Sequence, residues 1–162
     1  MNVHELPRSC IGRRERFISV HGLDISAECC TAFLPAAPQY SVGRMNIGID
    51  YDYTITENPE FFRSFTKSLA ESGNEIYIIS SFTKADEPFV EEIVAEKKRQ
   101  LDKWEIDYKK LEMAPEPIPP NKARLCRKYK ISVMIDDDAR NLMEIMRSEK
   151  GIVCLQFMPK GD

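Results

Sequence analysis

Acidic side chains gather at two places in this sequence, each directly after a short apolar segment. Asp50 and Asp52 follow Ile-Gly-Ile, and the run Asp136-Asp137-Asp138 follows Val-Met-Ile. Carboxylates that converge in one cleft repel one another strongly unless a proton or a cation lies between them. Because all of these ligands would be oxygens, an open site of this kind favours Mg²⁺. The acidic residues therefore predict a magnesium site, provided that the fold brings the two places together.

A hydroxyl and an ammonium group are expected at the same site. Ser80 ends the apolar segment Ile-Tyr-Ile-Ile, and Lys122 stands near the expected start of a helix. A cleft that holds Mg²⁺, a lysine, a hydroxyl and a free carboxylate suits a phosphoryl group. Lys109, Lys110 and Arg124 compete with Lys122 for the cationic role. We prefer Lys122 because it alone lies in a Pro-Asn-Lys context at a helix start.

Several other kinds of chemistry are excluded or disfavoured. Both histidines, His4 and His21, precede Met45, so the chain from Met45 onward holds neither a Ser-His-Asp triad nor a histidine zinc site. The five cysteines include no Cys-x-x-Cys motif, which argues against a disulfide framework or a zinc ribbon. A net charge of −3 disfavours a global electrostatic grip on nucleic acid.

Short apolar strands and amphipathic helices alternate along the chain from Met45 onward. The hydrophobic periods predict strands over 45–50, 75–80, 111–113, 131–135 and 152–157. They predict helices over 59–72, 86–104, 121–129 and 139–149, with Asn58 and Asn121 as N-caps. This order predicts an α/β fold: a three-layer α/β/α sandwich around a mostly parallel, five-stranded, Rossmann-like sheet. Ligands of such folds bind at the carboxyl ends of the strands, where the acidic residues would meet.

The first 44 residues differ from the remainder. They hold both histidines, three of the five cysteines and the basic cluster Arg13-Arg14-Glu15-Arg16. We expect an N-terminal extension over 1–44 and a folded domain over 45–162. The extension is a flexible segment, a packed accessory segment or sequence upstream of the true start codon. The chain shows no membrane-spanning apolar stretch and no secretory signal pattern. Its odd number of cysteines without a Cys-x-x-Cys motif indicates reduced thiols, so we expect a cytoplasmic protein.

The ordered motifs resemble those of the haloacid dehalogenase (HAD) superfamily. The segment Ile-Gly-Ile-Asp50-Tyr-Asp52-Tyr-Thr54 looks like its first motif, a strand followed by Asp-x-Asp-x-Thr. Ser80, Lys122 and the acidic run 136–138 are similar to its second, third and fourth motifs, in the same order. Together they span about 45–157. The chain departs from the family at Tyr53, where glycine is commonest.

The resemblance implies a role for each motif residue. Asp50 would be the nucleophile that forms an aspartyl phosphate, and Asp52 would be the general acid and base. Ser80 would donate a hydrogen bond to a phosphoryl oxygen, and Lys122 would offset negative charge. The implied Mg²⁺ ligands are Asp50, the backbone carbonyl of Asp52, Asp136 and Asp137, with Asp138 as a third acid that leaves the choice open.

We therefore expect a Mg²⁺-dependent phosphomonoester hydrolase of the capless or minimal-cap type. The expected substrate is a phosphorylated small molecule or polynucleotide. By family analogy, such members either act on large substrates, such as polynucleotide or protein phosphates, or close the site by forming homo-oligomers. Some similarity to polynucleotide-kinase phosphatase domains and deoxyribonucleotidase-like proteins favours a nucleotide or polynucleotide phosphate. The alternative is a non-catalytic phospho-ligand or protein-binding module on a HAD scaffold, and a phosphotransferase is a weaker option.

Plain structural explanations compete with each of these assignments. Asp50 and Asp52 suit a turn after a strand, and Asp138 suits the N-cap of the following helix. Lys122 would then be a solvated surface lysine.

Overall fold

The computed structural model describes residues 43–158 of the chain. The expected extension and its basic cluster lie outside these residues, apart from Gly43 and Arg44. Among the described residues, no helix is long and apolar enough to cross a membrane.

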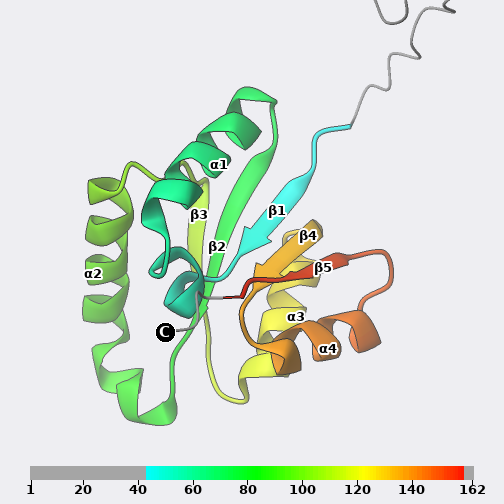
Figure 1. Ribbon diagram of the computed structural model, residues 1–162. Coiled ribbons are helices and arrows are strands. Elements are labelled where there is room, and N and C mark those ends of the chain that lie inside the picture. The colour runs from blue at the N-terminus through cyan, green and yellow to red at the C-terminus, as the bar shows by residue number, and fades with distance from the viewer. Residues whose placement is uncertain (1–42, 159–162) are drawn as a thin grey trace, which may run out of the picture. The chain divides into compact units, whose positions relative to one another are not determined.

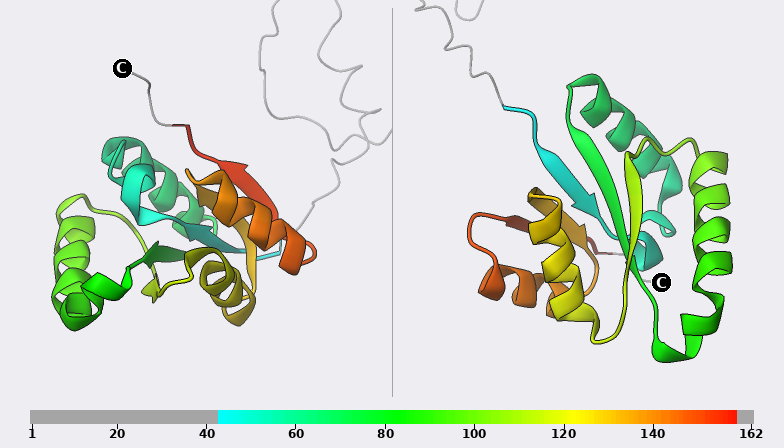
Figure 2. Two further views of the ribbon diagram at one scale, coloured as in Figure 1. Left: turned by 90° about the horizontal axis from the view of Figure 1, so that it is seen from below. Right: turned by 180° about the vertical axis from the view of Figure 1, so that it is seen from behind.

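Five parallel strands form a single sheet in the order β3-β2-β1-β4-β5 (Figure 1). Helices cover both of its faces (Figure 2), so the predicted three-layer α/β fold is confirmed. The strands are β1 (Asn46–Ile49), β2 (Glu75–Ser81), β3 (Lys110–Ala114), β4 (Ile131–Asp136) and β5 (Val153–Gln156). The helices are α1 (Pro59–Glu71), α2 (Val90–Lys103), α3 (Ile118–Lys128) and α4 (Ala139–Ser148).

Alternate residues of the central strand face two separate hydrophobic cores. Ile47 and Ile49 of β1 pack into the core that Phe62 of α1 and Leu101 of α2 complete. The second core lies under α3 and α4, and an added Cβ on Gly48 would point into it, 2.7 Å from Sδ of Met134. Side chains of a strand point to opposite faces in turn, so β1 serves both layers and is buried on both.

Local signals place α1 correctly. The side chain of Asn58 accepts a hydrogen bond from the backbone N–H of Phe61 at 3.1 Å, as an N-cap does, and Pro59 is the first helical residue. Gly73 follows the helix with a φ of 83°, a conformation that glycine adopts at no steric cost.

The start of α3 differs from the sequence prediction. The helix begins at Ile118, not after Asn121, and includes Pro119 and Pro120 in its first turn. The first turn of a helix makes no use of its backbone N–H groups, so proline is tolerated there. The side-chain amide of Asn121 instead donates to the carbonyls of Pro115 and Pro117, both at 3.0 Å. Asn121 is therefore a helical residue that ties down the preceding loop.

The entry to α2 also differs. A 3₁₀ turn, η2 (Lys84–Phe89), precedes the helix, which begins at Val90. Asp86 closes a capping box with Thr83 at the start of this turn, and Pro88 lies inside it.

The strand order creates one switch point. From β1 the chain moves outward through β2 to β3, then returns to the other side of β1 to form β4 and β5. At the carboxyl ends of β1 and β4 the connections leave in opposite directions, which opens a crevice in folds of this class.

Replacing Gly48 with valine should lower the free energy of unfolding by about 1–3 kcal/mol, the usual cost of overpacking a core. The added side chain would collide with Met134 and lie 3.3 Å from carbons of Ile131 and Ile79. Chemical denaturation followed by circular dichroism measures the change. Gly43→Val is the matched control, because no atom lies within 4 Å of a Cβ at that position. Equal losses in both variants would contradict this account of the packing.

Candidate functional site

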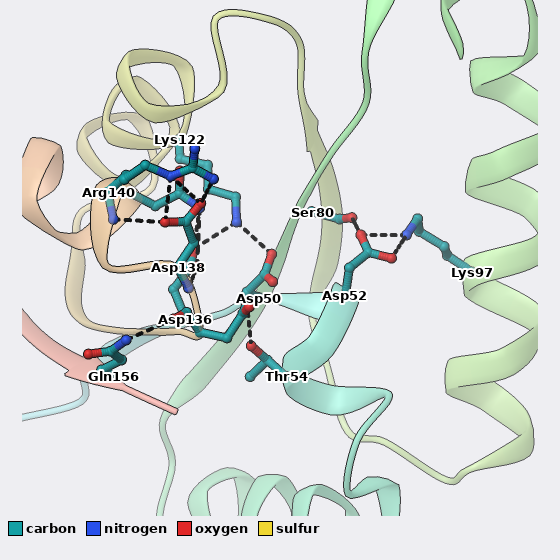
Figure 3. Close-up of polar contacts among 12 residues, drawn as sticks. Asp50, Asp52, Thr54, Ser80, Lys97, Lys122, Asp136, Asp138, Arg140 and Gln156 are labelled. Carbon is teal, nitrogen blue, oxygen red and sulfur yellow. Dashed lines mark hydrogen bonds and ion pairs between the residues drawn. The ribbon is translucent and has the colours of Figure 1, made fainter. Parts of the chain in front are cut away.

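The ammonium of Lys122 lies between two buried carboxylates. Its Nζ donates to Oδ1 of Asp50 at 2.6 Å and to Oδ2 of Asp136 at 2.7 Å (Figure 3). Asp50 directly follows β1, Asp136 ends β4, and Lys122 projects from the second turn of α3. Lys122 is only 2% exposed, so this ion pair is part of the interior. The structure thus brings three predicted site residues together at the switch point.

The three cations that compete with Lys122 lie elsewhere. Lys109 pairs with Glu75, Lys110 pairs with Glu112, and Arg124 donates to the side chain of Asn121. The proline-rich start of α3 is what distinguishes Lys122, because it places this lysine four residues into the helix, beneath the carboxyl edge of the sheet.

The three consecutive acids after β4 have different surroundings. Asp136 is fully buried and accepts hydrogen bonds from Lys122, the Asn141 amide and the backbone N–H of Asp138. Asp138 caps α4 and pairs with Arg140, with Nη2 to Oδ2 at 2.7 Å. Among residues 43–158, the side-chain carboxylate of Asp137 accepts a single, long hydrogen bond of 3.4 Å, from the Thr54 hydroxyl. Among the three, Asp137 therefore has the most lone-pair capacity left for a ligand.

Burial and charge act on Asp50 and Lys122 in opposite senses. Burial raises the pKa of Asp50 above its ordinary value; the ammonium of Lys122 opposes this, and the charge of Asp136 adds to it. Burial lowers the pKa of Lys122, but the charges of Asp50 and Asp136 outweigh it, so its pKa lies above that of a free lysine. Lys122 is accordingly a permanent cation.

The set of oxygen donors fits a hard divalent cation. Asp50, Asp136 and Asp137 each offer a carboxylate oxygen within 4.8 Å of the other two. Three carboxylates and one ammonium leave two negative charges uncompensated, the charge that Mg²⁺ neutralises. The buried amide oxygen of Asn141 has no hydrogen-bond partner among the described residues, and Asn141 lines the same cleft. It offers a further acceptor for water bound to such an ion.

A second polar cluster lies beside the first. Both carboxylate oxygens of Asp52 accept from Nζ of Lys97 on α2, at 2.6 and 2.8 Å. The hydroxyl of Ser80, which is fully buried at the end of β2, donates to Oδ2 of Asp52 at 2.8 Å (Figure 3). Ser80 therefore positions Asp52, whereas its neighbour Ser81 lines the cleft.

Lys97 is the residue of this cluster that the sequence prediction missed. Lys97 shares the buried face of α2 with Leu101 and is only 9% exposed. Its Nζ lies 4.1 Å from the centroid of the Tyr51 ring, which adds a cation–π contact to the pair with Asp52. A lysine on the apolar face of a helix signals the need for an acidic partner, but the sequence does not identify which residue that is.

An open cleft of about 940 Å³ lies over both clusters. Asp50, Asp52, Lys97, Lys122 and Asp137 contribute to its lining. Its wider rim includes the turn after β1, the segment after β2, the start of α3 and the start of α4: Tyr53, Phe82, Thr83, Lys84, Ile118 and Arg140. The volume suits a ligand of nucleotide size.

Comparison with known proteins yields structural matches only. No family model matches the sequence, and no curated protein matches it. A universal stress protein solved in complex with cAMP has a TM-score of 0.50 at 9% identity, over 72% of this chain and 98% of that chain. A member of the universal stress protein family from Burkholderia pseudomallei has a TM-score of 0.49 at 11% identity, over 72% of this chain and 96% of that chain. The universal stress protein of Archaeoglobus fulgidus, in complex with dAMP, has a TM-score of 0.45 at 12% identity. This match covers 68% of this chain and 96% of that chain.

These matches correct the HAD resemblance. The match with a TM-score of 0.50 is a universal stress protein, whose α/β fold differs from that of HAD phosphatases, so the predicted membership of the HAD superfamily is wrong. The predicted Mg²⁺-dependent phosphatase that acts through an aspartyl phosphate is wrong with it. The motifs misled because polar residues follow the buried strands of any parallel α/β sheet, so their order reflects the fold more than the reaction.

The geometry at Asp52 agrees with this correction. A general acid must carry a proton that it can give away. The carboxylate of Asp52 pairs with an ammonium through both oxygens and also accepts from Ser80. Donors therefore occupy both oxygens of Asp52 in this structure. The role of general acid was implied only by the HAD resemblance and is withdrawn with it.

Replacing Lys122 with methionine should lower the free energy of unfolding by about 3–5 kcal/mol at pH 8 in chelator, because two buried carboxylates lose their counter-charge. The folded-state pKa of Asp50 then rises further above that of the unfolded chain, because the ammonium that lowers it is gone. The folded state binds more protons, so the loss should shrink as the pH falls towards 5. Denaturant unfolding curves recorded between pH 8 and pH 5 measure the loss in the free energy of unfolding.

Lys109→Met is the matched control, since Lys109 pairs with Glu75 at the surface. Its melts should superimpose on those of the wild type at each pH. A Lys122→Met protein with wild-type stability at pH 8 would contradict the structural role assigned to this ammonium.

Proposed function

We propose that this chain is a non-catalytic binding module for a nucleotide, whose phosphate group lies over Lys122 and a divalent cation held by Asp50 and Asp137. The observation that carries the proposal is the buried ammonium of Lys122 between Asp50 and Asp136. Next to it lies the carboxylate of Asp137, whose hydrogen bond from Thr54 is long and leaves lone pairs for a ligand. This arrangement stands at the switch point of a parallel sheet, where ligands of such folds bind.

Charge balance requires a cation together with the phosphate. A phosphate that approached Asp50, Asp136 and Asp137 without one would be repelled, because Lys122 offsets only one of the three carboxylates. Mg²⁺ would supply two positive charges there and take oxygen ligands from both the protein and the phosphate. Asp50 and Asp137 are the favoured ligands, because Asp136 already accepts from three donors.

The residues around the phosphate position favour binding over turnover. Asp52, the nearest candidate for an acid, is held in its ion pair with Lys97 and by Ser80. The pair also neutralises a carboxylate that would otherwise repel an anion. In this proposal the Asp52–Lys97 pair is a fixed wall of the cleft and transfers no proton.

The nucleotide class is supported by the fold and by the cleft. The universal stress protein with a TM-score of 0.50 was solved with cAMP, an adenine nucleotide. The cleft here has room for a base and a sugar beyond the phosphate position, at about 940 Å³. Adenosine 5′-monophosphate is therefore the first ligand to test.

Adenosine 5′-monophosphate should bind in Mg²⁺ and lose at least roughly tenfold in affinity when chelator replaces the metal, as the carboxylates then repel the phosphate. Asp137→Asn should produce a similar loss in Mg²⁺ and leave the melting temperature near that of the wild type. Isothermal titration calorimetry measures the affinities. No inorganic phosphate should appear over the same period.

Asp107→Asn is the matched control, an exposed aspartate outside the cleft. It should bind as the wild type does. Three results would count against the proposal: no binding to the wild type, binding indifferent to Mg²⁺, or equal weakening by Asp107→Asn and Asp137→Asn.

A further inference from the structure

We infer that the ring of Tyr53 is a stacking platform for the base of the bound nucleotide. This inference rests on the proposed function and adds to it the part of the ligand that lies beyond the phosphate. Three features of Tyr53 point the same way: its exposure, its place on the cleft and the conformation of its backbone.

The ring of Tyr53 is exposed to solvent, whereas most large apolar side chains of the described residues are buried. The residue is 67% exposed and lies on the lining of the cleft, next in sequence to Asp52 and Thr54. An aromatic ring is costly to leave in water, and nucleotide-binding proteins offer such rings to bases, whose flat faces stack on them.

The backbone of Tyr53 is held in a conformation that tyrosine disfavours. Its φ is 56°, in the left-handed region, where a bulky side chain is a genuine outlier. Glu105 and Lys130 also have positive φ values, but each directly follows the C-cap residue of a helix, where one left-handed residue is ordinary. Tyr53 lies instead in the middle of the turn η1 (Tyr51–Ile55).

Hydrogen bonds of the site maintain this strained turn. The backbone N–H of Tyr53 donates to Oγ1 of Thr56 at 2.9 Å, and the N–H of Thr56 donates to the carbonyl of Tyr51 at 3.2 Å. Thr54 is fully buried and donates to Asp137. Because its neighbours are anchored on both sides, the ring of Tyr53 is displayed from a fixed base. Strain that persists at a cleft is a mark of function when the surroundings hold it in place.

Tyr53 lines the same cleft as the residues of the phosphate position. Tyr53 is three residues after Asp50, and Asp52 between them points its carboxylate to Lys97 and Ser80. The lining of the cleft continues from the carboxylates to Tyr53. A nucleotide with its phosphate at Lys122 can therefore reach Tyr53 with its base.

Glycine or asparagine at this position would remove the strain and the platform together. Asparagine tolerates the left-handed region because its short side chain bonds locally. Tyr53→Asn should therefore raise the melting temperature by a few degrees while it weakens nucleotide binding. A residue kept only for packing would show the opposite sign in stability.

The test compares adenosine 5′-monophosphate with ribose 5-phosphate, which carries the same phosphate and sugar without a base. In Mg²⁺ the wild type should bind the nucleotide roughly tenfold more tightly, the scale expected of one stacked base. Tyr53→Asn should remove this difference and leave the affinity for ribose 5-phosphate unchanged, and Tyr53→Phe should keep it. Phe89→Ala, a change at an exposed aromatic residue outside this cleft, should also keep it.

The possible results separate the two proposals. If both ligands bind the wild type equally, the stacking inference fails and the phosphate site stands. If Tyr53→Asn weakens both ligands alike, Tyr53 shapes the turn rather than reads the base, and the inference also fails. If neither ligand binds, the proposed function fails and the inference fails with it. Loss of the difference in Tyr53→Asn alone, with a higher melting temperature, supports the inference.

Discussion

Two carboxylates are buried next to each other in this protein, and the ammonium of Lys122 is what makes their burial tolerable. Asp50 and Asp136 end neighbouring central strands, where the parallel sheet forces their side chains together. Removing a charged group from water costs several kcal/mol unless its partners are well placed. The position of α3 follows from this constraint. The helix must begin early enough, at Ile118, to carry Lys122 under the sheet edge, and its prolines occupy the one turn that tolerates them.

The order of the elements could be read from the sequence because each depends on local patterns. Asn58 and Pro59 mark the start of α1 by capping chemistry that involves only neighbouring residues. Apolar runs such as that before Ser80 mark strands buried on both faces. The start of α3 was missed because prolines usually break helices, whereas here they lie in the first turn, which tolerates them.

The site was predictable in its residues but not in its chemistry. Asp50, Lys122 and Asp136 meet as expected, because strand ends converge in any parallel sheet. Lys97 could not be placed without the fold, since its partner Asp52 is 45 residues away and on another element. The same limit explains the mistaken family. Motif order describes where polar residues leave the strands, whereas a general acid is defined by its hydrogen-bond partners, which only the three-dimensional structure reveals for Asp52.

The distances along the chain between the site residues determine when the site forms during synthesis. Lys122 meets Asp50 across 72 residues, and Asp136 joins them from the penultimate strand. A growing chain therefore has no site until β4 has been made and has docked beside β1. Contacts of such long range form late and slowly, because the chain must first pay the entropy of closing large loops. A ligand that bridges these residues binds only the completed sheet. Its binding would therefore stabilise the whole domain against unfolding, rather than a single loop.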